Sequence, residues 1–247
     1  SAQRIFRLLE LLARQGTMGV TELSTASGLN KTTVFRQLNT LIELGYVCRD
    51  AAGRYRLTLK LLTVAGWQLA RSDLRAEVHP YLCELAEAGG ETVHLVQREG
   101  NHILYIYKIE AKVGTIRMVS HVGMVHPMYC SGVGKAIMAT LPDEEVKKIW
   151  NESIIEKKTD KTITDFSQMQ EVLEEVRQNG YALDDEENEK GVRCIAACLH
   201  GYQKEVKYAF SISGPTSRMT RERVKELAVD VKKVQEELSR ELGYYKS

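Results

Sequence analysis

Residues 20–38 read VTELSTASGLNKTTVFRQL, in which a glycine separates two segments with helical periodicity. The first segment predicts a short helix that Thr21 is placed to cap. Gly28 suits the positive φ of a tight turn between helices, and Asn30 is placed to cap the helix that follows. Because two helices joined through such a turn form a helix-turn-helix, we predict this motif over about residues 20–39.

The second helix of this motif has an apolar face and a polar face. On a helical wheel, the side opposite the apolar residues offers short hydroxyls and a guanidinium. Arg reads guanine and Gln pairs with adenine in the major groove, so this face suits DNA bases. The alternative is a solvated face of a three-helix bundle. On these helices we expect DNA contacts from Thr21, Lys31, Thr32, Thr33, Arg36 and Gln37.

A β-hairpin is predicted next. Residues 46–57 alternate apolar and polar side chains around an Asp-Ala-Ala-Gly turn. With Tyr55 and Leu57 facing the helices, we expect Arg54 and Arg56 to project together from the other face. Arginines on such a wing contact phosphates, which supply most of the non-specific affinity for DNA. The head of the chain is therefore predicted to be a winged helix that binds double-stranded DNA.

The charge of the chain divides into a basic head and an acidic body. The whole chain has 34 Lys and Arg against 33 Asp and Glu, a net charge of +1 that taken alone disfavours nucleic acid as a partner. Residues 1–72 carry ten basic and four acidic residues, or +6, and the remainder carries −5. This asymmetry indicates domains with different partners. We place a DNA-binding domain at 1–58, with the wing at about 46–57, a linker helix at 59–72 and a second domain at 73–247.

The linker segment is apolar on nearly every side of a helix. A helix of this kind must be buried on several sides. It could pack against its own two domains, or against its copy in a second subunit. The second arrangement would set the spacing of two recognition helices on DNA.

The overall composition excludes several classes of protein. It is 43% hydrophobic and 27% charged, as in ordinary globular proteins. No stretch approaches the roughly 18 apolar residues of a membrane span. Five cysteines, scattered through apolar contexts, favour a reducing cytoplasm over a disulfide framework. We therefore expect a cytoplasmic protein with no membrane partner.

The second domain mixes strands with helices, which predicts an α+β fold of the sensor type. Alternating segments predict strands at 92–98, 102–110, 115–119, 181–184, 192–200 and 207–213. Helical periodicity predicts helices at 74–88, 131–140, 143–151, 167–178 and 220–243.

Three stretches of this domain have the chemistry of a binding site. Residues 127–136 bring small residues to a helix start, which favours a carboxylate or phosphate but also suits a plain turn. Residues 184–189 crowd five carboxylates that could do acid–base chemistry, hold a cation or simply be solvated. The hydroxyls of Ser211 and Ser213 lie on one face of a strand, where they could bind an oxyanion or be merely polar.

The whole pattern resembles the IclR family of bacterial transcriptional regulators. In the head, the likeness rests on residues 20–38, Leu44-Gly45-Tyr46-Val47 and Tyr55-Arg56-Leu57. In the body, the three stretches above carry it, so that it covers nearly all of the chain. It is closest to the sugar-acid-sensing, KdgR-like branch in Ile106-Tyr107-Lys108-Ile109, Met128-Tyr129-Cys130-Ser131, Gly180-Tyr181 and Asp185-Glu186-Glu187. The resemblance implies a winged helix-turn-helix, a linker helix and a GAF-like effector-binding domain.

The resemblance also implies a ligand, a small carboxylate such as a keto or sugar acid. Carried over motif by motif, it implies backbone N–H donors at Gly132 and Val133, polar contacts from Asp184 and Cys194, and hydroxyl donors at Ser211 and Ser213. Pocket walls are expected at Met118, His126 and Val192. Val133 stands where the family commonly has a smaller residue, which would narrow the pocket. A homodimer or dimer of dimers, formed through the linker helix on operator DNA, is implied as well.

Two other interpretations use the cysteines and histidines. A soft metal site could be assembled from Cys130, Cys194, Cys198, His126 and His200, but no CxxC or HxxxH pair is present. A thiol hydrolase would use Cys130 or Cys194, and nothing in the sequence positions a base beside either. We therefore predict no metal, no cofactor and no enzymatic activity. The expected function is a repressor of a carbon-catabolism operon, with an activator as the alternative.

Overall fold

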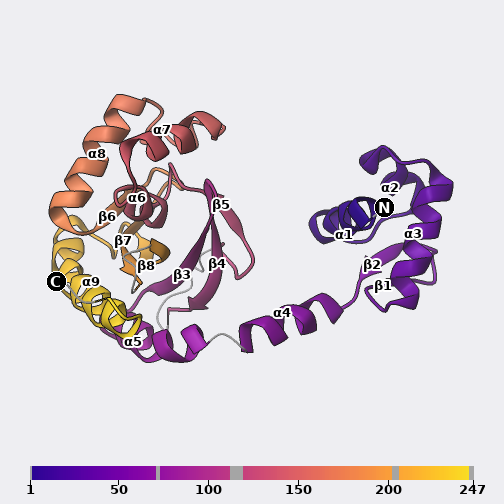
Figure 1. The fold of residues 1–247 in the computed structure, drawn as a ribbon, viewed down its shortest axis with the longest axis horizontal. Helices are drawn as coiled ribbons and strands as arrows, with labels where there is room; N and C mark the ends of the chain where they lie inside the picture. The colour runs from indigo at the N-terminus through magenta and orange to yellow at the C-terminus, as the bar shows by residue number, and fades with distance from the viewer. Residues whose placement is uncertain (1, 71–72, 112–118, 202–205, 245–247) are drawn as a thin grey trace. The chain divides into compact units, whose positions relative to one another are not determined.

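The chain divides into two compact units, residues 1–73 and residues 74–247 (Figure 1). The structure, a computed structural model, describes residues 2–70, 73–111, 119–201 and 206–244. Each unit has a hydrophobic core of its own, one in the first unit and two in the second. Each unit is therefore a folded domain with its own core.

The N-terminal unit is a winged helix-turn-helix. Its elements are α1 (Ala2–Gln15), α2 (Val20–Ser27), α3 (Lys31–Glu43), β1 (Val47–Arg49), β2 (Tyr55–Leu57) and α4 (Lys60–Ala70). The antiparallel strands β1 and β2 form the wing. Tyr55 is buried in the same core as the leucines of α1 and α3, so the wing packs directly on the helices.

A β-bridge joins the wing to the segment before α2. The N–H of Met18 donates to the carbonyl of Tyr55 at 2.9 Å, and the N–H of Tyr55 donates to the carbonyl of Met18 at 2.8 Å. Met18 is itself buried in the core. These two bonds hold the wing and the start of the helix-turn-helix together.

The caps of the helix-turn-helix agree with the sequence in two places and differ in one. Gly28 ends α2 with φ 69°, and the Asn30 side chain accepts a hydrogen bond from the Thr33 N–H at 2.8 Å, as predicted. The prediction that Thr21 caps α2 was wrong. The helix begins one residue before Thr21, and the Glu22 carboxylate closes its first turn by accepting from the Gly19 N–H at 2.7 Å.

The C-terminal unit is built on a curled, six-stranded antiparallel sheet. Its strand order is β5-β4-β3-β8-β7-β6. The strands are β3 (Thr92–Glu99), β4 (His102–Ile109), β5 (Val125–Pro127), β6 (Ala182–Asp185), β7 (Val192–His200) and β8 (Val206–Pro215). The sequence did not predict the short edge strand β5, and its expected strand at 115–119 lies almost entirely outside the described residues.

Helices cover both faces of this sheet (Figure 1), which confirms the α+β fold. One face carries α6 (Gly132–Met138), α7 (Asp143–Glu152) and α8 (Phe166–Asn179), and the other carries α5 (Asp73–Gly89) and α9 (Arg221–Glu241). Side chains of β7 alternate between the two cores: Ile195 and Ala197 pack with α5 and α9, whereas Ala196 and Cys198 face α6.

Candidate DNA-binding surface and ligand cavity

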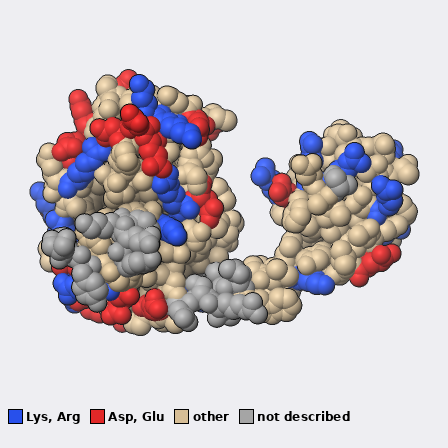
Figure 2. Space-filling view, viewed as in Figure 1, with Lys and Arg blue, Asp and Glu red and all other residues tan. Residues whose placement is uncertain are grey.

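The polar face of α3 is exposed as its amphipathic pattern predicts. Lys31, Thr32 and Arg36 are exposed, and Thr33 is half-buried. Phe35, which the sequence did not single out, is 46% exposed beside them. The buried positions of the helix lie on the core side, so α3 presents a guanidinium, an ammonium and hydroxyls outward. In the view of Figure 2, Lys and Arg are more widespread than Asp and Glu on this unit.

Two residues that the sequence placed among the DNA contacts have other environments. Gln37 is only 8% exposed, because it borders the apolar side of α3 and is packed there. Arg54 is exposed like Arg56, but its guanidinium is already bonded within the unit. Its guanidinium donates to the Thr17 carbonyl at 2.6 Å and to the Glu22 carboxylate at 3.3 Å. Arg56 is exposed on β2 as expected.

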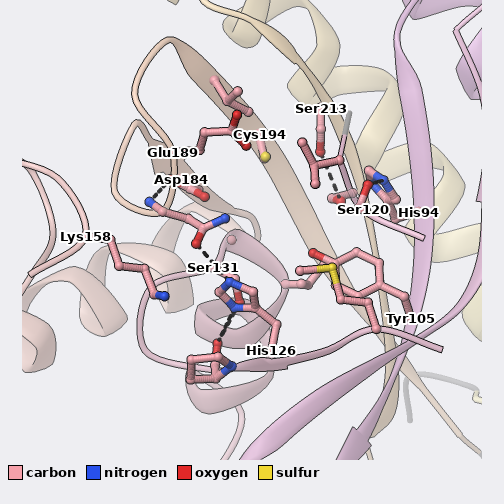
Figure 3. Close-up of a pocket in the computed structure, with 18 of the residues that line it drawn as sticks. His94, Tyr105, Ser120, His126, Ser131, Lys158, Asp184, Glu189, Cys194 and Ser213 are labelled. Atoms are coloured by element: carbon pink, nitrogen blue, oxygen red, sulfur yellow. Dashed lines mark hydrogen bonds between the residues drawn. The ribbon is translucent and has the colours of Figure 1, made fainter. Parts of the chain in front are cut away.

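In the C-terminal unit, a cavity of about 520 Å³ lies between the start of α6 and the sheet (Figure 3). The strand register explains how its floor forms. His94 on β3 pairs with Ser211 on β8, while Ser213 on β8 pairs with Cys194 on β7, which in turn pairs with Asp184 on β6. Partners on adjacent antiparallel strands are roughly 5 Å apart. Four strands thus place five polar side chains on one face.

The structure brings together all six residues that the resemblance implies for ligand contact. These residues line the cavity: Gly132, Val133, Asp184, Cys194, Ser211 and Ser213. Of the expected wall residues, His126 and Val192 also line it, and Met118 lies outside the described residues. The sequence interpretation did not assign several polar lining residues to the site. His94, Tyr105, Ser120 and Lys158 come from segments outside the three stretches, whereas Asn188 and Glu189 lie within the stretch 184–189.

The start of α6 is shaped by two close approaches. Ser131 caps the helix by accepting a hydrogen bond from the Gly134 N–H at 3.1 Å. A Cβ on Gly134 would collide with the Met128 carbonyl, so this glycine lets α6 pack closely on the segment before it. A Cβ on Gly132 would lie 3.3 Å from the Ala196 Cβ of β7 and 3.4 Å from the Asp184 nitrogen of β6, so α6 begins close to both strands. Helix geometry leaves the N–H groups of Gly132 and Val133 without an intrahelical acceptor.

A cluster of buried charges lies beside the cavity. Lys135 is 1% exposed and forms an ion pair with Glu187. Asp184 is 4% exposed, and its Oδ1 accepts hydrogen bonds from the N–H groups of Glu187 at 2.8 Å and Asn188 at 3.4 Å. Burial raises the pKa of Asp184 to about 7, although Lys135 works in the opposite direction.

The two histidines of the cavity are neutral near pH 7. Burial lowers the pKa of His94 to about 3, with a smaller contribution from Lys108. Its Nε2 lies 2.7 Å from the Ser120 hydroxyl. Burial also lowers the pKa of His126, whose Nε2 lies 2.8 Å from Asn188 Oδ1. These imidazoles therefore supply hydrogen-bonding groups to the cavity and no positive charge.

The thiols of this unit are not prepared for nucleophilic chemistry. Burial raises the pKa of Cys130 to about 12 and also raises the pKa of Cys194, so both remain protonated at neutral pH. Cys198 lies elsewhere, with its carbonyl bonded to Gln235 of α9.

Within the described ranges, no three His, Cys, Asp or Glu side chains gather as metal ligands. No described helix has both the length and the apolar character to cross a bilayer.

A winged helix-turn-helix in one unit, beside a second unit with a polar cavity of small-molecule size, defines the class of DNA-binding transcriptional regulators. Residues 1–51 match the IclR helix-turn-helix domain, and residues 67–240 match the C-terminal domain of the bacterial transcriptional regulator IclR. The chain therefore belongs to the IclR family of bacterial transcriptional regulators.

Known relatives match the chain over almost its whole length. It is 34% identical to the HTH-type transcriptional regulator KdgR of Escherichia coli (strain K12), covering 99% of this chain and 93% of KdgR. It is 35% identical to the transcriptional repressor IclR of the same organism, covering 98% and 90%. The crystal structure of Thermotoga maritima IclR matches with a TM-score of 0.80 at 32% identity, over 98% of each chain. The family and these relatives are transcriptional regulators rather than enzymes, and the family binds operator DNA through its helix-turn-helix domain.

Proposed function

We propose that this chain is a cytoplasmic repressor of a carbon-catabolism operon, and that a small carboxylate, a keto or sugar acid, alters its binding to operator DNA. The observation that carries the proposal is the cavity of the C-terminal unit. Its size suits a small molecule, and its polar groups converge from the start of α6 and from four strands. Relatives that are repressors, such as IclR of E. coli, support the sign of regulation.

The DNA contacts are assigned to exposed residues of the N-terminal unit. Lys31, Thr32, Thr33 and Arg36 on α3 face the bases, since this helix has its polar side outward. Arg56 on the wing contacts a phosphate, and Thr21, exposed on α2, lies at the backbone. Arg54 and Gln37 remain proposed DNA contacts but rank below these, because Arg54 is bonded to Thr17 and Glu22 and Gln37 is only 8% exposed.

The ligand contacts follow from the cavity. The N–H groups of Gly132 and Val133 receive the ligand carboxylate, because they open α6 and have no helical acceptor. The hydroxyls of Ser211 and Ser213, 3.4 Å apart, donate hydrogen bonds to it from the strand. The groups that contact its remaining polar atoms and form the walls are Asp184, Cys194, His126 and Val192, with Met118 as a further wall residue.

Dimerisation through α4 completes the proposal. Leu59, Leu62 and Trp67 are 76%, 68% and 64% exposed, which is unusual for large apolar side chains on one short segment. Packing them against a second copy would bury them and fix the spacing of two recognition helices on a palindromic operator. The functional division is then a DNA-binding domain at 1–58, a linker at 59–72 and an effector domain at 73–247.

The proposal is tested in two steps. A binding selection from random duplex DNA first yields an operator sequence, and a thermal-shift screen of keto and sugar acids identifies stabilising ligands. A stabilising acid should then change the affinity of the full chain for that operator. If no acid of either kind alters the melting temperature or the operator affinity, the carboxylate proposal is wrong. Failure to select any DNA sequence would remove the operator-binding role.

A further inference from the structure

The buried charges at the cavity do not balance. The ammonium of Lys135 is already paired with Glu187, whose second oxygen is buried without a partner among the described residues. Asp184 therefore leaves one excess negative charge at the cavity when it is ionised. The exposed Lys158 and Glu189, which also line the cavity, carry opposite charges.

The tyrosine, cysteine and histidine side chains around Asp184 carry no charge near pH 7, and Lys108, whose Nζ donates to the Ser120 carbonyl, is paired with Glu110 at 2.8 Å. Burial raises the pKa of Tyr105 and of the two thiols, Cys130 and Cys194, and lowers the pKa of His94 and His126. No buried cation among the described residues is thus left over for an anion. An anionic ligand and an ionised Asp184 would repel each other in a medium that screens them poorly.

Asp184 and Gly132 are neighbours in the lining of the cavity, since a Cβ on Gly132 would lie 3.7 Å from the Asp184 Cβ. In the proposed binding mode, a carboxylate held by the N–H of Gly132 would therefore lie close to the Asp184 side chain. The Oδ1 atom of Asp184 accepts the hydrogen bonds from the backbone N–H groups of Glu187 and Asn188. The Oδ2 atom has no hydrogen bond from the described residues, which leaves that oxygen for a ligand in the cavity that Asp184 lines.

We propose that the cavity takes up one proton from solvent together with its carboxylate ligand, and that Asp184 carries this proton on Oδ2 and donates it to a ligand oxygen. This inference rests on the proposed function, since it assumes an anionic ligand. It makes Asp184 a specificity-determining residue. A protonated carboxyl favours a ligand whose facing atom accepts a hydrogen bond, such as a keto oxygen.

The pKa of Asp184 sets the sign and the range of the effect. In the free protein this pKa is raised to about 7, and a neighbouring anion raises it further. Below about pH 7 the free protein already holds the proton, so affinity is nearly constant. Above about pH 7 the proton must be bound with the ligand, and affinity falls by about tenfold per pH unit.

Calorimetric titration of the full chain tests this proposal, with pyruvate, 2-oxobutyrate and D-gluconate as probes from about pH 6 to about pH 9. In wild type, each acid that binds should lose about tenfold in affinity per pH unit above about pH 7. At about pH 8, titrations in two buffers of different ionisation enthalpy should show uptake of about one proton per ligand. This second measurement needs no variant.

The variant Asp184→Asn isolates the residue. Its amide oxygen can accept the two backbone N–H groups while its NH₂ donates where the proton would be. It should therefore bind the same acid with an affinity that does not change with pH. The matched control is Glu171→Gln, an exposed carboxylate of α8 that does not line the cavity, and it should keep the wild-type pH dependence.

The alternative outcomes are distinguishable. Binding by wild type that is independent of pH, or without proton uptake, would overturn the proton proposal and leave the carboxylate function standing. A second pair of results would also overturn it: Asp184→Asn binds at no pH, and wild type binds more tightly at high pH. Asp184 would then be ionised in the complex and would accept a hydrogen bond from a ligand hydroxyl. If none of the three acids binds wild type, the carboxylate function fails and this proposal fails with it.

Discussion

The two units of this protein solve recognition in opposite ways. The winged helix gathers its exposed polar groups within a short continuous stretch, residues 20–57, and presents them to solvent. The cavity gathers its groups from residues as distant as His94 and Ser213, and buries them. A surface that meets phosphates can keep unpaired cations, because water solvates them. A buried site must instead neutralise each charge or pair it.

The difference is clearest in the two cation environments. Arg36 on α3 is exposed, and its charge is free to attract DNA. Lys135 on α6 is buried, and Glu187 takes up its charge. The basic side chain of Arg36 is thus available to attract DNA, whereas that of Lys135 takes part in the internal packing of the C-terminal unit. Four substitutions test this contrast, beginning with the largest expected effect.

Replacing Lys135 with Met should destabilise the C-terminal unit by about 3–5 kcal/mol, because Glu187 is left buried with no counter-ion. Denaturant unfolding of the full chain measures this change. The double variant Lys135→Met, Glu187→Leu should recover much of the loss, since it removes both charges. A single variant as stable as wild type would mean that the ion pair contributes little.

Replacing Arg36 with Ala should cost about 1–3 kcal/mol of operator binding, or about 5- to 150-fold, with little effect on random DNA. The reason is that a guanidinium on the outward face of α3 reads a base edge. Competition binding with selected and random duplexes measures the ratio. Arg14→Ala, an exposed arginine on α1, is the control and should leave the ratio unchanged. Equal losses on both duplexes would remove Arg36 from base reading.

Replacing Ser213 with Ala should weaken the ligand by about two- to tenfold, the value of one hydrogen bond, and should spare operator binding. Ser213 is 2% exposed and lines the cavity. Ligand titrations of the protein–operator complex provide the measurement. The control Ser217→Ala changes an exposed serine just past β8 and should behave as wild type. An unchanged titration for Ser213→Ala would remove β8 from the binding site.

Replacing Arg56 with Ala should weaken binding to every DNA sequence by about fivefold at ordinary salt and lower the salt slope by about 1. Arg56 is exposed on the wing and is assigned one phosphate. Arg54→Ala is the instructive comparison, because its guanidinium is bonded to Thr17 and Glu22. It should change the salt slope less than Arg56→Ala. The reverse order would restore Arg54 as the phosphate contact.

The sequence was sufficient for two of the three local determinants of the helix-turn-helix, and Thr21 as the cap of α2 was the exception. Gly28 and Asn30 could be assigned from neighbours within three residues, and both have the expected roles. Arg54 could not, because its environment depends on Glu22, 32 residues away. Gln37 was misplaced because a helical wheel gives an angle and not the depth of the packing around it.

The cavity shows the same limit more strongly. Its implied ligand residues came from a family resemblance and lie together in the structure, but the charge state of the site could not be read from either source. For the five-carboxylate loop, the sequence left acid–base chemistry, cation binding and plain solvation open. Within it, Asp184 and Glu187 are buried, whereas Glu189 is exposed. The register of β6 against β7, together with the position of Lys135, determines which of these carboxylates are buried and which is exposed.

The bridge between Met18 and Tyr55 has a consequence for how a signal could reach DNA. It fastens the wing to the start of α2, so that the wing and the helix-turn-helix move together as one body. With the proposed DNA contacts, a ligand could not release the wing from DNA and leave α3 bound. Control must then act on the spacing of whole winged helices along the duplex, which places the regulatory movement in the segment beyond the wing, α4.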